Sequence, residues 1–187
     1  MRIIGGISRG RRLAGPPKSG LRPTRGQVKE ALFNILSGRI LDARFLDLFA
    51  GTGAIGIEAL SRGAREVTFV ESHAETCRLL RANLRHCGYD QGVDVRRLSV
   101  ARFLNQPPAQ PFDIVFLDPP YHTVEGEKVL PSLGRGVIIR HNGVVVIEHF
   151  HKTRLADRIG HLALVKSYRY GDTLLSMYRH APAEDAP

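Results

Sequence analysis

The chain has 187 residues, 43% of them hydrophobic, and a formal net charge of +9. This length is typical of one globular domain with a small extension. No apolar run approaches the roughly 20 residues of a membrane helix, and "MRIIGGISRG" contains no long apolar segment of the kind found in secretory signals. The two cysteines, Cys77 and Cys87, form no CxxC pair, which indicates a reducing compartment and no zinc site. We therefore expect a cytoplasmic protein.

The basic residues concentrate near the N-terminus. Residues 1–29 contain eight of the 27 lysine and arginine residues and no acid. A localised basic segment is typical of nucleic-acid binding, because arginine forks suit phosphates and guanine edges. A solubilising tail and attraction to anionic lipid are the alternatives. The eight residues are Arg2, Arg9, Arg11, Arg12, Lys18, Arg22, Arg25 and Lys29.

The first elements in chain order are a hairpin and a helix. Residues 3–7 and 11–14 are predicted to pair, with a turn near Arg9 and Gly10. Thr24 is a plausible helix N-cap with Gln27 in the capping-box position, and Gly38 is a suitable end for that helix. The apolar stripe of this helix consists of Val28, Ala31, Leu32 and Ile35.

Strands and helices then alternate, which predicts a parallel sheet covered on both faces. Near the end, residues 163–171 and 173–179 face each other across Gly171 and Asp172 as an antiparallel hairpin, and residues 181–187 are predicted to be disordered. The expected strands are residues 45–49, 67–70, 93–98, 112–117 and 144–147. The expected helices are residues 55–61, 74–86, a short one near 102, and 124–140 with a break near Pro131.

A glycine-rich loop follows the first of these strands in "FLDLFAGTGAIGIEAL". Gly51, Gly53 and Gly56 match the dinucleotide fingerprint, but Asp47 at the strand end would repel a pyrophosphate. A cationic ligand such as S-adenosylmethionine, which has a sulfonium and an ammonium group, suits this carboxylate better. Glu71 ends the next strand, where an acid can accept hydrogen bonds from ribose hydroxyls.

The motif "DPPY" closes the fourth strand of this series and therefore lies at the same sheet edge as the glycine loop. The carboxylate of Asp118 and the carbonyl of Pro119 can accept the N–H hydrogens of an exocyclic base amine, which favours attack of its lone pair on a methyl group. Tyr121 can stack on the base. Pro119 and Pro120 fix the geometry on which in-line attack depends.

Together these motifs resemble the S-adenosylmethionine-dependent methyltransferases with a Rossmann-like fold, and most closely the bacterial RsmD family of small-subunit rRNA guanine-N2 methyltransferases. The resemblance rests on "MRIIGG", "RPT" with "VKEALFNIL", "DLFAGTGAIGIEALSRGA", "FVE", "DPPY" and "YGDTLLSMYR". It implies an α/β fold with a mostly parallel seven-stranded sheet and an antiparallel C-terminal hairpin. The basic hairpin and the RPT segment narrow the match to this family, because adenine-N6 enzymes share DPPY.

The resemblance also implies roles for individual residues. The cofactor-binding set would be Asp47, Phe49, Gly51, Gly53, Glu71, Ser99, Ala101 and Thr24. Asp118, Pro119, Pro120 and Tyr121 would be catalytic, and Arg2, Arg9, Arg11, Arg12 and Arg22 would bind RNA. Many relatives bind adenine with a polar residue near the end of the third strand; here that segment is "RLSVARFL", so Ser99 or a backbone amide would make the contact. The segment "RPTRGQVKE" lacks the acid and the arginine of "RPTxDRVRE".

We therefore expect residues 1–20 to form an RNA-binding arm, residues 21–180 a methyltransferase domain, and residues 181–187 a tail. The partner would be small-subunit (16S) rRNA in an assembled or partly assembled particle, and the protein a monomer. An adenine-N6 methyltransferase, a nucleotide-dependent oxidoreductase and a non-catalytic ribosome-assembly factor are the alternatives. His149, His151 and His161 are interpreted as surface residues rather than metal ligands.

Overall fold

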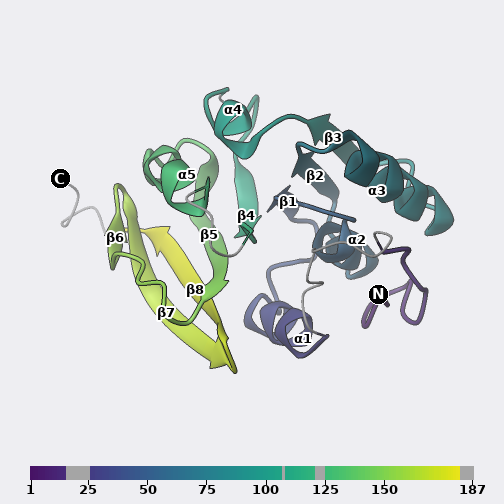
Figure 1. Cartoon of the computed structure of the whole chain (residues 1–187), viewed down its shortest axis with the longest axis horizontal. Coiled ribbons are helices and arrows are strands. Elements are labelled where there is room, and N and C mark those ends of the chain that lie inside the picture. Colours follow the sequence, from purple (N-terminus) through teal and green to yellow (C-terminus); the bar gives the residue numbers. More distant parts are fainter. Residues whose placement is uncertain (16–25, 107, 121–124, 182–187) are drawn as a thin grey trace.

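The structure is a computed structural model that describes residues 1–15, 26–106, 108–120 and 125–181. Its centre is one sheet with the strand order β3-β2-β1-β4-β5-β8-β7-β6 (Figure 1). The strands are β1 (Arg44–Leu48), β2 (Glu66–Glu71), β3 (Val93–Arg97), β4 (Phe112–Leu117), β5 (Ile139–Phe150), β6 (Arg158–Ile159), β7 (Leu162–Tyr170) and β8 (Thr173–His180). The first five are parallel, and β8, β7 and β6 continue the sheet in antiparallel pairs.

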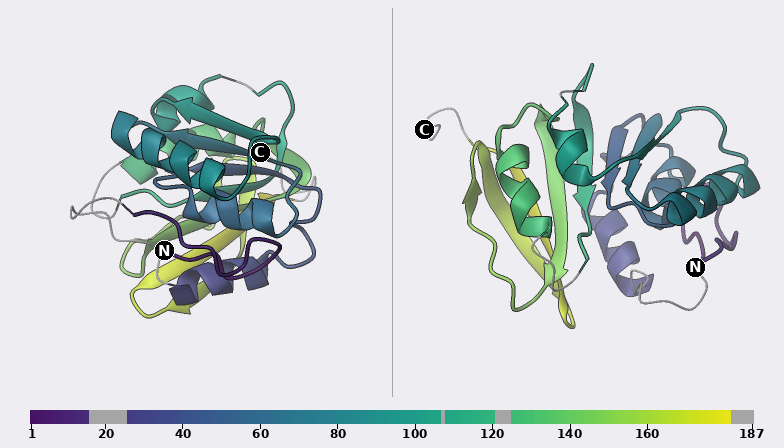
Figure 2. Two further views of the ribbon diagram at one scale, coloured as in Figure 1. Left: turned by 90° about the vertical axis from the view of Figure 1, so that its right-hand side faces the viewer. Right: turned by 45° about the horizontal axis from the view of Figure 1, so that its top comes forward.

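Helices cover both faces of the sheet, as the two views in Figure 2 show. Residues of α1, α2 and α3 pack with Phe45, Phe69 and Phe116 on one face. Residues of α4 and α5 pack with Leu46, Leu117 and neighbouring strand residues on the other. Successive strand residues point to opposite faces, so a strand that is covered on both faces must be a nearly continuous apolar run. This holds for β4 and for residues 144–147 of β5 at the centre of the sheet. The helices are α1 (Gly26–Ile35), α2 (Ala54–Ser61), α3 (Ala74–His86), α4 (Val100–Leu104) and α5 (Glu125–Gly134).

The predicted fold class is confirmed, with α/β architecture, a mostly parallel sheet and an antiparallel C-terminal hairpin. The sheet has an eighth strand, β6, that was not predicted, because two residues carry no readable periodicity. Strand β5 spans 12 residues instead of the predicted four. Its first residues, "IRHN", have mixed polarity, so the apolar pattern alone did not reveal them.

Residues 1–15 reverse direction but form no regular strands. A single antiparallel bridge joins Arg2 to Arg12, and backbone bonds connect Ile3 with Arg11 and Gly10, so the predicted hairpin is present only in this reduced form. Its turn spans residues 6–11. The segment lies beside α2 and α3, at the far end of the molecule from the C-terminal hairpin (Figure 1).

The order of strands reverses between β1 and β4. Strand β1 lies between β2 and β4, so the chain moves outward in one direction through β2 and β3 and then returns to the opposite side of β1. In open parallel sheets, ligands bind at the carboxyl ends of the strands where this reversal occurs. The segments that follow β1 and β4 therefore meet at the expected position of a site.

Candidate active site

The loop after β1 has an unusual backbone. Phe49 has a φ of 61° and Gly51 a φ of 54°. A positive φ is strained for an aromatic residue, and such strain is concentrated at functional sites. A Cβ added to Gly51 would meet only the carbonyl oxygen of Phe49, at 3.9 Å. The loop therefore presents open backbone at Gly51, where a ligand can approach closely.

Asp47 is buried directly beneath this loop. Its side chain is 2% exposed, and its carboxylate accepts a hydrogen bond from the backbone N–H of Gly56 in α2 at 2.9 Å. Burial raises the pKa of Asp47 to about 7, the Gly56 amide opposes that shift, and the nearby charge of Glu71 adds to it. The charged form of this carboxylate is therefore costly unless a positive group lies near it.

Glu71 is tied to the same loop from the end of β2. One carboxylate oxygen accepts a hydrogen bond from the backbone N–H of Gly51 at 3.0 Å. The other accepts from the backbone N–H of His73 at 2.8 Å and lies 3.0 Å from its ring Nδ1. The structure thus joins the predicted glycine loop and the predicted ribose-binding acid directly.

The corner after β4 begins beside the end of β1. The backbone N–H of Asp118 lies 3.5 Å from the carbonyl oxygen of Leu48, and Asp118 and Pro119 are half-buried. A Cβ on Gly126 would come within 2.8 Å of the Pro119 ring, so the start of α5 packs directly against the corner. These contacts hold Asp118 in a stiff segment. Tyr121 lies outside the described residues.

Acidic residues lie at or near the carboxyl ends of four neighbouring strands of the sheet. Asp47 lies on β1, Glu71 on β2 and the buried Glu148 on β5, and Asp118 directly follows β4. The residues two and four positions before each acid point to the same side of the sheet as the acid. The apolar ones among them pack on the face that α1, α2 and α3 cover. Alternation therefore assigns all four acids to that face. Such an edge favours a cationic ligand and disfavours a pyrophosphate.

Two predicted cofactor residues lie at the start of α4. Ser99 is the N-cap of α4, where its hydroxyl accepts a hydrogen bond from the backbone N–H of Arg102 at 3.3 Å, and Ala101 is exposed in the first turn of that helix. Both follow β3 on the far side of β2 from the glycine loop. Thr24 and Arg22 lie outside the described residues.

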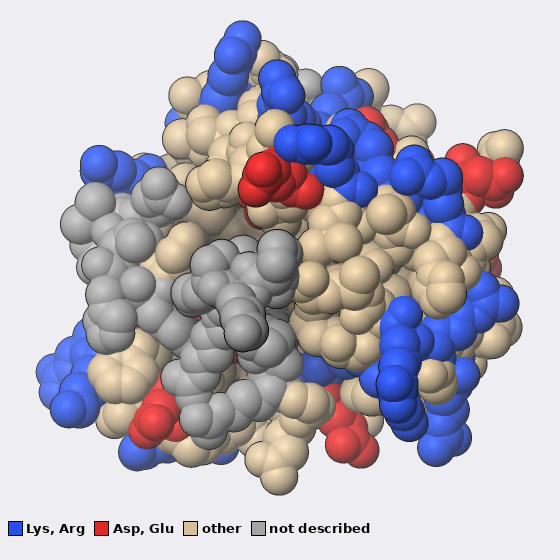
Figure 3. All heavy atoms as spheres, turned by 45° about the vertical axis from the view of Figure 1, so that its right-hand side comes forward, with Lys and Arg blue, Asp and Glu red and all other residues tan. Residues whose placement is uncertain are grey.

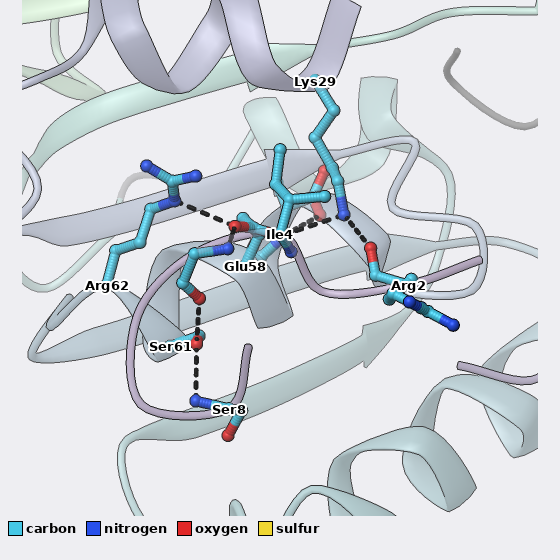
Figure 4. A network of polar contacts seen from close by, with 10 residues as sticks. Arg2, Ile4, Ser8, Lys29, Glu58, Ser61 and Arg62 are labelled. Carbon is cyan, nitrogen blue, oxygen red and sulfur yellow. Dashed lines mark hydrogen bonds and ion pairs between the residues drawn. The ribbon is translucent and has the colours of Figure 1, made fainter. Parts of the chain in front are cut away.

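Sequence reasoning missed a network around Glu58 (Figure 4). This α2 residue is fully buried, and its carboxylate accepts hydrogen bonds from the backbone N–H groups of Ile4 at 2.9 Å and Gly5 at 2.7 Å. Lys29 and Arg62 each form an ion pair with it at 2.9 Å. The signal was a single acid within the apolar helix "AIGIEALS", where a buried charge needs partners.

Lys29 consequently does not belong to the basic arm. It is 4% exposed, and besides its pair with Glu58 its ammonium group donates to the carbonyl oxygen of Arg2 at 2.7 Å. The sequence interpretation counted it with the basic arm because it is the last of eight basic residues in a segment without acids. Arg2, Arg9, Arg11 and Arg12 are exposed, so they are accessible to a partner.

The arm is fixed to the domain through further bonds. The hydroxyl of Ser61 donates to the carbonyl oxygen of Gly5 at 2.6 Å and accepts from the backbone N–H of Ser8 at 2.9 Å (Figure 4). The Ser8 hydroxyl lies 2.9 Å from the hydroxyl of Tyr89. Arginine and lysine side chains gather along the upper and lower right of the face in Figure 3. The bonds to Ser61 and Tyr89 hold the arm, and with it the arginines, in a defined position.

His149 is not the surface residue that the sequence predicted. It is 7% exposed, and its Nε2 lies 2.8 Å from the Ser176 hydroxyl on the neighbouring strand β8. Burial lowers its pKa. The sequence did not reveal this because β5 is buried on both faces from residue 143 to His149, so its residues lie inside the protein whichever face they point to. His161 is exposed and His151 is half-buried.

The described part of the chain contains neither a candidate metal-binding cluster nor a candidate membrane-spanning helix. Within residues 1–15, 26–106, 108–120 and 125–181, no group of three or more His, Cys, Asp or Glu side chains is placed to hold a metal ion. In the same ranges no helix combines the length and the apolar character that crossing a membrane requires.

Comparison with known proteins gives the class and the family. A family model described as "Conserved hypothetical protein 95" matches residues 1–179. The solved structure of the putative methyltransferase yhhF from Escherichia coli has a TM-score of 0.85 and 34% identity, and the match covers 96% of this chain and 97% of that one. The fold and the site thus define a methyltransferase of the Rossmann-like class.

Two curated relatives support the same assignment. Ribosomal RNA small subunit methyltransferase D of Haemophilus influenzae is 42% identical over 151 residues, which cover 79% of this chain and 78% of that protein. The putative rRNA methyltransferase YlbH of Bacillus subtilis is 32% identical over 181 residues, covering 96% and 98%. The chain belongs to the RsmD family of methyltransferases, as its motifs predicted.

Proposed function

We propose that this protein transfers a methyl group from S-adenosylmethionine to the exocyclic N2 amine of a guanine in small-subunit (16S) rRNA, within an assembled or partly assembled particle in the cytoplasm. The observation that carries the proposal is the stiff corner at Asp118, which begins beside the end of β1 at the edge that also bears Asp47 and Glu71. Relatives named as small-subunit rRNA methyltransferases support the choice of RNA.

The residues at this edge fit the proposed cofactor. Gly51 leaves open backbone, Glu71 is already positioned beside it, and Asp47 carries a carboxyl group whose charged form burial disfavours. A ligand with a sulfonium and an ammonium group would stabilise that charge, whereas a pyrophosphate would not. The cofactor would be held by Asp47, the loop from Phe49 to Gly53, and Glu71. When bound, it supplies an electrophilic methyl group on a positively charged sulfur.

Asp118 and Pro119 would hold the target amine. The lone pair of a guanine amine is delocalised into the ring, so the amine attacks poorly on its own. A carboxylate oxygen of Asp118 and the carbonyl oxygen of Pro119 would accept its two N–H hydrogens and direct the lone pair away from the ring. The packing of α5 against Pro119 keeps these acceptors in place. The base must leave its stack to reach them.

The arm would grip the RNA around the target. Arg2, Arg9, Arg11 and Arg12 are exposed on a segment that the Glu58 network fixes to α2. Phosphate contacts of this kind position a protein on RNA without reading its sequence. Because the arm is attached to α2, the helix that follows the glycine loop, the distance between bound RNA and the methyl donor would be constant.

The first experiment is methyl transfer from labelled S-adenosylmethionine to small subunits from cells that lack this gene, with deproteinised rRNA as a parallel acceptor. Digestion and mass spectrometry identify the product. N2-methylguanosine is expected, and the better acceptor reveals whether bound proteins help to present the base. N6-methyladenosine would move the protein to the adenine class. No transfer despite measurable cofactor binding would favour a non-catalytic assembly factor.

A further inference from the structure

Asn83 occupies a core position of α3 between Leu80 and Leu84, although its side chain is polar. It is 3% exposed. Its side-chain oxygen accepts a hydrogen bond from the backbone N–H of Ala14 at 2.9 Å. Its side-chain nitrogen donates to the carbonyl oxygen of Ala14 at 3.1 Å and to that of Thr52 at 3.0 Å. One buried amide thus joins the basic arm to the glycine loop.

The chemistry of these three bonds requires an amide. Asn83 uses both N–H donors and one acceptor position, so its orientation is fixed by its partners. An aspartate would face two carbonyl oxygens without a donor, and an alanine would leave those carbonyls and the Ala14 N–H without this partner. Thr52 stands between Gly51 and Gly53. The bond to its carbonyl therefore helps to orient the peptide unit that links Thr52 to Gly53 in the proposed cofactor loop.

We infer that Asn83 is a positioning residue that couples RNA binding on the arm to cofactor binding on the loop. This inference rests on the proposed function. RNA bound by the arm holds Ala14 in place, Ala14 holds the Asn83 amide, and the amide holds Thr52 in the conformation that accepts the cofactor. Because coupling between two binding sites is reciprocal, the cofactor must strengthen RNA binding by the same factor.

The coupling is measured through the effect of the bound nucleoside on the affinity for RNA. Filter binding of deproteinised 16S rRNA is carried out at one salt concentration, with and without saturating S-adenosylhomocysteine. The wild-type protein should bind the RNA about fivefold or more tightly with the nucleoside present, the usual scale of such coupling. In Asn83→Ala this ratio should fall to about one. Thermal unfolding of both proteins establishes that the variant is folded.

Tyr89→Phe is the matched control variant. It removes the bond between Tyr89 and Ser8, which anchors the arm but does not touch the loop. A general weakening of the arm would lower the coupling ratio in both variants. The inference expects Tyr89→Phe to keep the wild-type ratio, even if its absolute RNA affinity falls.

A second measurement requires no variant. Hydrogen exchange of the wild-type amides at residues 49–56 should slow when rRNA binds in the absence of any nucleoside. Unchanged exchange there, or an rRNA affinity of the wild type that S-adenosylhomocysteine does not alter, would overturn the coupling and leave the proposed function standing. Failure of the wild type to bind either deproteinised rRNA or small subunits would overturn both.

Discussion

The ammonium group of Lys29 lies 2.9 Å from a carboxylate oxygen of Glu58, and both side chains are almost fully buried. The pair joins α1 to α2, and through the carbonyl oxygen of Arg2 it also reaches the arm. A buried pair adds little net stability compared with apolar residues, but the loss of one partner leaves a buried charge with fewer partners.

Lys29→Met should therefore destabilise the protein by about 3 kcal/mol. The remaining contacts of Glu58, with Arg62 and two backbone amides, keep the cost from rising further. Urea denaturation measures the change in the free energy of unfolding. Lys152→Met, at an exposed position, is the control and should change it by less than about 0.5 kcal/mol. Equal effects of the two substitutions would mean that the pair is unimportant for stability.

Asp118→Ala should abolish methyl transfer and leave the affinity for S-adenosylhomocysteine nearly unchanged. The carboxylate is proposed to contact the target amine, whereas the cofactor is proposed to lie over the loop after β1. Calorimetric titration with S-adenosylhomocysteine and a methyl-transfer assay on the same preparation separate the two effects. Parallel loss of activity and cofactor binding would place Asp118 in the cofactor site instead.

The pH dependence of stability should report the burial of Asp47. Its folded-state pKa is about 7, above the ordinary value of 3.8, so the folded protein holds a proton that the unfolded chain releases. Stability linked to this group is therefore complete below pH 3.8 and is lost as the pH rises towards 7. The full loss amounts to about 4 kcal/mol.

Asp47→Asn isolates this contribution. The asparagine does not titrate, so the free energy of unfolding of the variant should gain about 3 kcal/mol relative to the wild type between pH 5 and pH 8. Urea denaturation of both proteins at the two pH values gives the difference. A constant difference between them would mean that Asp47 is charged in the folded protein without its ligand.

Gly6→Ala should displace the arm. A Cβ at this position would lie 1.7 Å from the carbonyl oxygen of Ser61, and the residue has a φ of 72°. We expect a loss of stability of about 2 kcal/mol or more and weaker rRNA binding. Gly10→Ala is the matched control, because its φ of 89° is equally unfavourable but nothing lies within 4 Å of the added atom. Similar losses in both variants would show that backbone strain, rather than the contact with Ser61, matters.

Charge reversal at Arg9, Arg11 and Arg12 should weaken rRNA binding and flatten its salt dependence. Each lost phosphate contact lowers the slope of log affinity against log salt by about 0.7 to 0.9. Filter binding across a series of salt concentrations provides the slope. Reversal of Lys152 changes the net charge away from the arm and serves as control. An unchanged slope for the arm variant would remove the arm from RNA binding.

The sequence predicted well what depends on local patterns. The bounds of the helix at residues 74–86 and of the strand at residues 112–117 agree with α3 and β4, because strong periodicity and neighbouring breakers define both. Asp47, Gly51 and Glu71 could be selected since their motif has a fixed order along the chain. In the structure Glu71 accepts a hydrogen bond from the backbone of Gly51, and Asp47 accepts one from the backbone of Gly56 in the helix that follows the same loop.

Contacts between distant segments could not be predicted in the same way. Glu58 and Asn83 are single polar residues on apolar helix faces, and their partners lie 53 to 69 residues away in the arm. No periodicity relates such positions. Lys29 was counted with the basic arm because its charge is visible in the sequence, whereas its pairing with the buried Glu58 is not.

The anchoring of the arm also has a consequence for the order of synthesis. Ala14 is translated 69 residues before Asn83, the residue whose amide holds it. At translation rates of about 5–20 residues per second, the arm waits about 3–14 s for that partner. During this interval its arginines are attached to a nascent chain on a ribosome, surrounded by RNA of the chemical kind that the finished arm is proposed to bind. The domain must withdraw the arm from such contacts as α2 and α3 fold, and the buried bonds to Glu58, Ser61 and Asn83 supply the free energy for that withdrawal.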